Sequence, residues 1–107
     1  MKQIVEKLLE RGLIFKSLKE ITPKELNSRK RVHIYLGVDK KDYYHIIIEI
    51  EKKSRILIKE SKEFQELHSR LESLIKSKIT KKHIYIQAPL CSKAKAYLEE
   101  SGWRVVG

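Results

Sequence analysis

Residues 31–51 read RVHIYLGVDKKDYYHIIIEIE, and this stretch decides the fold. Residues 31–38 alternate apolar side chains with polar or small ones, which is the pattern of a half-buried strand. Residues 39–42 form a turn sequence, because aspartate favours turns. Residues 43–51 are almost all β-formers and include three consecutive isoleucines, as in a strand that is covered on both faces. The stretch therefore predicts a hairpin of two strands.

On its C-terminal side, a third short strand is predicted at residues 55–59, which would extend the hairpin into an antiparallel meander. Ser61 is expected to cap the helix that follows. The spacing of apolar residues then predicts a helix, a strand, a helix and a final strand, at residues 61–78, 83–87, 92–101 and 103–106. A strand–helix–strand unit of this kind normally joins parallel neighbours through a right-handed crossover.

On its N-terminal side, residues 2–11 are predicted to form a helix that ends at Gly12. A second, short helix is expected to start at Thr22-Pro23-Lys24-Glu25, where Glu25 can close a capping box. We therefore expect one domain over residues 1–107, with an N-terminal helical segment (1–30) and an α/β core (31–107). The predicted fold class is a three-layer α/β/α arrangement around a mixed five-stranded sheet, in the order β-β-β-α-β-α-β.

The charge of the chain points to a polyanionic partner. It has 24 Lys and Arg residues against 14 Asp and Glu residues, a formal net charge of +10, and a pI near 9.7. A basic domain of this kind is typical of proteins that bind DNA or RNA. The alternative is a lysine-rich surface that only keeps the protein in solution.

The lone cysteine, Cys91, excludes an internal disulfide and a cysteine-based zinc site. A single thiol suits a reducing compartment. No signal-peptide pattern is seen at the N-terminus, and no stretch approaches the roughly 20 apolar residues of a membrane span. We therefore expect a cytoplasmic protein with no membrane partner.

Basic residues gather around the predicted turns and helix ends, where they could contact phosphates without reading sequence. The predicted nucleic-acid contacts are Lys40, Lys41, Lys52, Lys53, Arg55, Lys81, Lys82, Lys93 and Lys95. Tyr35, Tyr43 and Tyr44 could stack on unpaired bases, although aromatic side chains in a β-rich core more often pack.

The segment Ile34-Tyr35-Leu36-Gly37-Val38-Asp39, followed downstream by residues 84–87 and 102–105, resembles the ribonuclease H-like superfamily. The layout is similar to the N-terminal part of RuvC-type resolvases and DEDD-class transposases, and the resemblance covers the region from residue 31 onward. It implies a 3-2-1-4-5 strand order, counting from the strand at 31–38. It also implies that Asp39, at the end of the first strand, binds a divalent metal.

Metal-assisted phosphodiester cleavage needs at least two convergent carboxylates around Mg²⁺ or Mn²⁺. The resemblance implies a second acid at the end of the fourth strand, but this sequence has Gln87 there. Glu63 or Glu66, on the helix predicted at residues 61–78, could supply the partner, and the catalytic set is Asp39, Glu63 and Gln87. The alternative is that Asp39 only begins a turn.

The chain also resembles the restriction-endonuclease-like fold, whose signature is an aspartate followed by a strand that ends in Glu-x-Lys. Glu51-Lys52-Lys53 fits these letters, with Asp39 or Asp42 upstream. The competing catalytic set is therefore Asp42, Glu51 and Lys53, with lysine steadying the developing charge. Glu49 and Glu51 share one face of their predicted strand, so both could equally be its solvated end.

The four histidines show no zinc spacing, although His33, His45 and His83 lie on predicted strands and two of them could meet across the sheet. The predicted function is nucleic-acid binding on a nuclease-like scaffold, either as a metal-dependent nuclease or in a degenerate, inactive form. The alternative is a protein-interaction or adaptor module, as a homodimer or with another protein, in a DNA- or RNA-processing complex.

Overall fold

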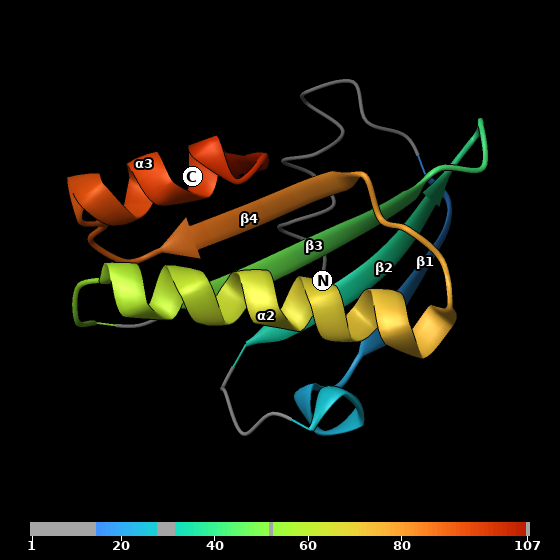
Figure 1. Cartoon of the computed structure of the whole chain (residues 1–107), viewed down its shortest axis with the longest axis horizontal. Coiled ribbons are helices and arrows are strands. Elements are labelled where there is room, and N and C mark those ends of the chain that lie inside the picture. Colours follow the sequence, from blue (N-terminus) through green and yellow to red (C-terminus); the bar gives the residue numbers. More distant parts are fainter. Residues whose placement is uncertain (1–14, 28–31, 52, 107) are drawn as a thin grey trace.

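Five strands form one mixed sheet in the computed structural model, which describes residues 15–27, 32–51 and 53–106 (Figure 1). The spatial order follows the chain, from β1 to β5. The first three strands are antiparallel neighbours, whereas β3, β4 and β5 are parallel. Their bounds are β1 Phe15–Ile21, β2 His33–Asp39, β3 Tyr44–Glu51, β4 Lys81–Gln87 and β5 Trp103–Val106.

The two α-helices form the crossovers between parallel strands, whereas a short 3-10 helix joins two antiparallel strands. The 3-10 helix η1 (Pro23–Leu26) joins β1 to β2, α2 (Ile58–Ile75) joins β3 to β4, and α3 (Ser92–Glu100) joins β4 to β5. The predicted mixed five-stranded α/β fold is confirmed, and the order β-β-β-α-β-α-β is observed with β1 in place of the strand predicted at residues 55–59. Neither described α-helix is long and apolar enough to cross a membrane.

The main core lies on the face of the sheet that α2 and α3 cover. Because side chains alternate along a strand, one set of isoleucines faces these helices. The core contains Ile34, Ile46, Ile48, Ile50, Ile84 and Ile86 from the strands, with Phe64, Leu67, Leu71 and Leu98 from the helices. Both described α-helices therefore form a single layer, as Figure 1 shows for α2 lying across the sheet. The helix predicted at residues 2–11 lies outside the described residues, so the third layer stays a prediction.

The opposite face carries a smaller apolar cluster. Tyr35 and Ile47 are buried at its centre, and Phe15, Leu18 and Tyr85 pack around them. Side chains two residues apart on a strand point to the same face. The same face as Tyr35 and Ile47 therefore carries the polar side chains of His33, Asp39, His45, Glu49, Glu51 and His83.

The structure differs from the sequence-based prediction in two elements. The predicted strand at residues 55–59 is absent: Ile56 makes one isolated bridge to Leu90, and α2 starts at Ile58 instead of at a Ser61 cap. The edge of β3 that this strand would need is taken by β4. The remaining strand is β1, within the segment expected to be helical, and it pairs with β2.

The start of the short helix η1 was predicted correctly, since the Glu25 carboxylate accepts the backbone N–H of Thr22 at 2.7 Å. The strand order implied by the ribonuclease H-like resemblance is wrong. It would place the strand at 31–38 beside β4, whereas β2 lies between β1 and β3 and β4 pairs with β3.

Candidate functional site

The two ends of the sheet separate the residues of the first predicted catalytic set. Asp39 ends β2 and Gln87 ends β4, and these strands run in opposite directions because β2 is antiparallel to β3 while β3 is parallel to β4. At a rise of about 3.3 Å per residue, the seven-residue strands hold the two side chains roughly 20 Å apart along the sheet. Glu63 lies early in α2, the helix that follows the far end of β3, and so it does not join Asp39.

The competing set is divided in the same way. Asp42 lies in the β2–β3 turn, whereas Glu51 is the last residue of the eight-residue strand β3, and Lys53 follows it. Asp42 is instead ion-paired with Lys16 of β1. The structure therefore brings together neither full set, and each end of the sheet carries its own polar cluster.

The first cluster joins Asp39, His45 and His83 in a hydrogen-bonded chain. Asp39 Oδ2 lies 2.8 Å from His45 Nε2, and His45 Nδ1 lies 3.0 Å from His83 Nε2. The two imidazole rings are buried and stacked, with centroids 5.2 Å apart and planes inclined by 8°. The hydrogen bond from His45 is the main cause that lowers the pKa of the Asp39 carboxyl below its ordinary value.

Asp39 also organises the turn that follows it. Its Oδ1 accepts the backbone N–H groups of Lys41 at 2.8 Å and Tyr43 at 3.0 Å. The Asp39 carbonyl accepts the Asp42 N–H at 3.0 Å, and Asp42 adopts a left-handed φ of 68°. The alternative interpretation of Asp39 as a turn residue is thus what its contacts support, with the link to His45 in addition.

The second cluster lies at the opposite end of the same face. The Cα partners His33 and Glu49 face each other on β2 and β3, and Glu20 of β1 lies 3.4 Å from His33 Nδ1. Glu49 is almost fully buried. Burial, followed by the neighbouring charges of Glu49 and Glu20, together raises the pKa of Tyr35 to about 12.

Glu51 and Gln87 extend this second cluster, because they are Cα partners on the parallel strands β3 and β4. Glu49 and Glu51 share a face and could each offer a carboxylate to a hard cation. However, no group of three His, Cys, Asp or Glu side chains in residues 15–27, 32–51 and 53–106 is arranged to hold a metal ion. The described residues therefore do not complete the Mg²⁺ or Mn²⁺ site that the sequence led us to expect.

The predicted phosphate contacts also divide between the ends. Lys40, Lys41 and Lys81 are exposed near the β2–β3 turn, while Lys53, Arg55, Lys93 and Lys95 are exposed beyond β3 and β4. Lys52 lies outside the described residues. Lys82 differs from the others because its ammonium donates to the Ser101 carbonyl at 2.5 Å and lies 5.9 Å from the centre of the Trp103 ring. Burial lowers the pKa of Lys82 below its ordinary value.

Cys91 occupies the N-cap position of α3 and is half-buried. The backbone N–H groups of Ala94 and Lys93 lower the pKa of the thiol, and the nearby positive charge of Arg55 adds to this effect. No described base is hydrogen-bonded to the thiol, which gives no support to a nucleophilic role.

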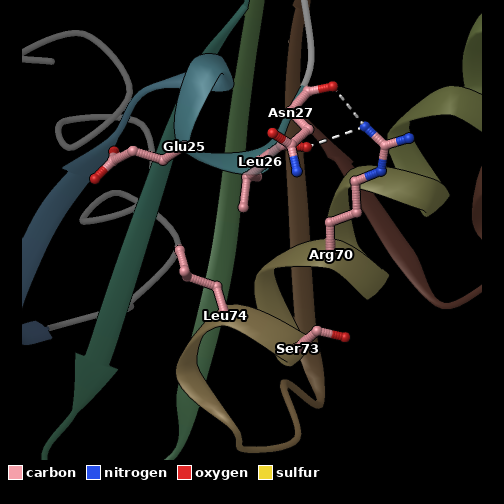
Figure 2. Close-up of a pocket in the computed structure, with 6 residues that line it drawn as sticks. All are labelled: Glu25, Leu26, Asn27, Arg70, Ser73 and Leu74. Atoms are coloured by element: carbon pink, nitrogen blue, oxygen red, sulfur yellow. Dashed lines mark hydrogen bonds between the residues drawn. The ribbon is translucent and has the colours of Figure 1, made fainter.

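An open hollow of about 430 Å³ lies between η1 and the C-terminal half of α2 (Figure 2). Arg70 crosses it and donates to the carbonyls of Leu26 and Asn27 at 3.0 Å each, and its other nitrogen pairs with Glu66. These bonds fasten η1 to α2 and occupy the guanidinium. The hollow is lined by Glu25, Leu26, Asn27, Arg70, Ser73 and Leu74, and it contains no residue of either polar cluster.

Two contacts were not foreseen from the sequence. The meeting of His45 and His83 was considered, but the bond from His45 to Asp39 was not. Glu20 was missed altogether because its segment was assigned to a helical region. A hairpin with its turn at residues 39–43 places Asp39 opposite the strand that begins at Tyr44, so the register of β2 and β3 was the available signal for the first contact.

The described sheet and its two α-helices define a mixed five-stranded α/β fold. No protein-family model matches the sequence, and a search of the curated proteins finds no match.

Solved structures do match. The structure of EndoMS in its apo form has a TM-score of 0.57 at 15% identity, over 98% of this chain and 44% of that chain. A repair endonuclease from Pyrococcus abyssi has a TM-score of 0.56 at 14% identity, over 97% of this chain and 44% of that one. An EndoMS complex with double-stranded DNA has a TM-score of 0.52 at 15% identity, over 97% and 43%.

At these identities the similarity concerns the fold, and this chain spans less than half the length of the structures that it matches. The fold is therefore similar to that of part of these repair endonucleases, and its strand order differs from the one that the ribonuclease H-like resemblance implies.

Proposed function

We propose that this protein binds DNA with a nuclease-like scaffold. The observation that carries the proposal is the match of 97% of the chain to the fold of an endonuclease solved on double-stranded DNA. The formal net charge of +10 supports it, because lysines and arginines that neutralise phosphates release counterions from the DNA. Charge of this kind gives affinity without sequence preference.

Cleavage is the second candidate, and one arrangement favours it. Glu49, Glu51 and Gln87 lie on one face at the C-terminal ends of the parallel strands β3 and β4, which is the end of an α/β sheet where ligands usually bind. The described residues do not complete a metal site, so Mg²⁺ or Mn²⁺ stays a hypothesis and no catalytic step follows from the geometry. An adaptor or homodimer function is the remaining alternative.

One set of gels tests these proposals. Labelled duplex, single-stranded and branched DNA and single-stranded RNA are incubated with the protein over a salt titration, with Mg²⁺, with Mn²⁺ or with chelator. The proposed function is supported if the protein binds DNA and the logarithm of the binding constant falls linearly with the logarithm of the salt concentration. An absence of binding near 100 mM salt, about the physiological range, contradicts it.

The same gels test cleavage with a matched pair of variants. If the protein cuts DNA only with metal, the double variant Glu49→Gln/Glu51→Gln should lose cutting. The control Glu99→Gln/Glu100→Gln removes two exposed carboxylates of α3 and should cut normally. Equal cutting by both variants would contradict a role for Glu49 and Glu51. A protein complex that survives nuclease treatment and high salt would favour the adaptor.

A further inference from the structure

We propose that the β2–β3 hairpin, residues 39–43, is a preformed contact for the phosphate backbone of duplex DNA. The inference rests on the proposed DNA binding and says where on the protein the contact lies. Figure 1 shows this hairpin projecting from one end of the sheet, at the turn between β2 and β3.

The outward charge of the hairpin is positive. Lys40 and Lys41 are exposed at its tip, and Lys81 is exposed beside it, because Lys81 is the Cα partner of His45 on the neighbouring strand. The two acidic residues of the hairpin do not offset these lysines outward. Asp42 is ion-paired with Lys16, and the Asp39 carboxylate bonds inward to His45 and to the turn backbone.

The hairpin is held in one shape before any ligand arrives. Asp39 accepts two N–H bonds from the turn, and backbone bonds join Asp39 to Asp42 and to Tyr43. The bond from Asp39 to His45, and from His45 to His83, fastens the turn to a buried part of the sheet. A contact element that is already ordered loses less conformational entropy on binding than a flexible loop does.

The chemistry of the exposed side chains suits DNA phosphates better than base edges. Ammonium groups donate hydrogen bonds and cannot accept them, and compact point charges bind phosphates without sequence preference. Tyr43 is 54% exposed next to these lysines, and its ring can lie against the sugar or against an unpaired base. Hairpin contacts are therefore expected to tolerate sequence changes in the DNA.

Fluorescence anisotropy with one labelled duplex tests the inference in two variants of equal charge. Lys40→Ala/Lys41→Ala changes the hairpin, and Lys59→Ala/Lys62→Ala removes two exposed lysines from the N-terminal part of α2. We expect the hairpin variant to bind about 10-fold more weakly at moderate salt. Its slope of log affinity against log salt should be less steep by about 2, because two phosphate contacts are lost. The α2 variant should stay within about 2-fold of the unmodified protein, and Lys40→Arg/Lys41→Arg should restore binding.

The outcomes separate this inference from the proposed function. If the unmodified protein binds the duplex but both alanine variants weaken it equally, the charge acts diffusely and the hairpin contact is refuted, while DNA binding stands. If the unmodified protein does not bind the duplex, the proposed function fails and the inference fails with it. Urea unfolding midpoints that match across the variants show that lost binding is not lost folding.

Discussion

His45 Nε2 lies 2.8 Å from the carboxylate of Asp39, six residues earlier and on the neighbouring strand. This bond joins an exposed turn to a buried pair of stacked histidines. A neutral imidazole has one donor and one acceptor nitrogen. When His45 donates to Asp39 from Nε2, its Nδ1 accepts from His83, so the three side chains form one directed chain.

The first prediction concerns the charge of Asp39. Asp39→Asn keeps an oxygen for the turn N–H groups but removes the carboxylate that accepts from His45, so we expect a lower urea midpoint at pH 7. Asp39→Ala removes the turn bonds as well and should lower it more. Because the folded-state pKa of Asp39 is lowered, its contribution is complete above the ordinary value of 3.8 and is lost as the pH falls through the folded pKa. A gap between the unmodified protein and Asp39→Asn that persists unchanged well below pH 3.8 would contradict this assignment.

The second prediction concerns the coupling of His45 and His83. Replacing either histidine by phenylalanine keeps an aromatic ring but leaves a buried nitrogen without its present partner, at a cost of about 1–3 kcal/mol in the free energy of unfolding. The double variant removes both nitrogens of the shared bond, so it should cost about 1 kcal/mol less than the sum of the two. Urea unfolding of all four proteins gives this coupling, and strictly additive costs would rule out the bond.

The sequence predicted most of the fold because most segments have a clear apolar period. The hairpin at residues 31–51 and the final strand at 103–106 were found within one or two residues. The strand β1 was missed because its side chains show no alternation: only Ile21 is fully buried, while Phe15 and Leu18 are partly buried. The glycine inside β2 was the available sequence signal for β1, because a glycine within a strand often marks a close neighbour. A Cβ at Gly37 would come within 2.7 Å of the Phe15 ring.

The candidate site was less predictable than the fold, because it depends on which strand lies beside which. The residues 55–59 favour a strand by composition, but their place beside β3 is filled by β4. As a result, β2 lies between β1 and β3 and not beside β4, and Gln87 lies at the end of the sheet opposite Asp39. Local patterns do not encode such long-range pairing, whereas Glu49 and Glu51 were correctly placed on one face because alternation within a strand is local.

The third prediction concerns Tyr35 and its acidic neighbours. Burial, then Glu49 and Glu20, raises the pKa of Tyr35 from the ordinary value of 10.0 to about 12, so a late ionisation step is expected at high pH. Ultraviolet absorbance of phenolate over an alkaline titration measures this, and Tyr35→Phe should remove the late step. Glu49→Gln should lower the pKa of Tyr35, because one raising charge is gone. An unchanged late step in Glu49→Gln would mean that the carboxylate does not face Tyr35.

The fourth prediction distinguishes Lys82 from its neighbour Lys81. Lys82→Met keeps the apolar stem but removes the donor to the Ser101 carbonyl and the cation near Trp103, which should cost about 1 kcal/mol in the free energy of unfolding. Lys81→Met changes an exposed side chain and should stay within about 0.5 kcal/mol. The order should reverse for DNA affinity, which Lys81→Met lowers and Lys82→Met leaves unchanged. Equal effects of the two variants in both measurements would refute the distinction.

The last prediction concerns the thiol of Cys91. The N–H groups of Ala94 and Lys93 at the start of α3 stabilise the thiolate, and the charge of Arg55 adds to them, so the pKa lies below the ordinary value of 9.0. The rate of alkylation by iodoacetamide, followed against pH, should therefore reach its midpoint below that of a free thiol. Arg55→Gln should move the midpoint upward and slow the reaction at neutral pH. Arg104→Gln removes the same charge from β5, where it does not contribute to this shift, and should leave the midpoint in place. If both variants shift the midpoint equally, the overall charge of the protein and not the position of Arg55 sets the reactivity of Cys91.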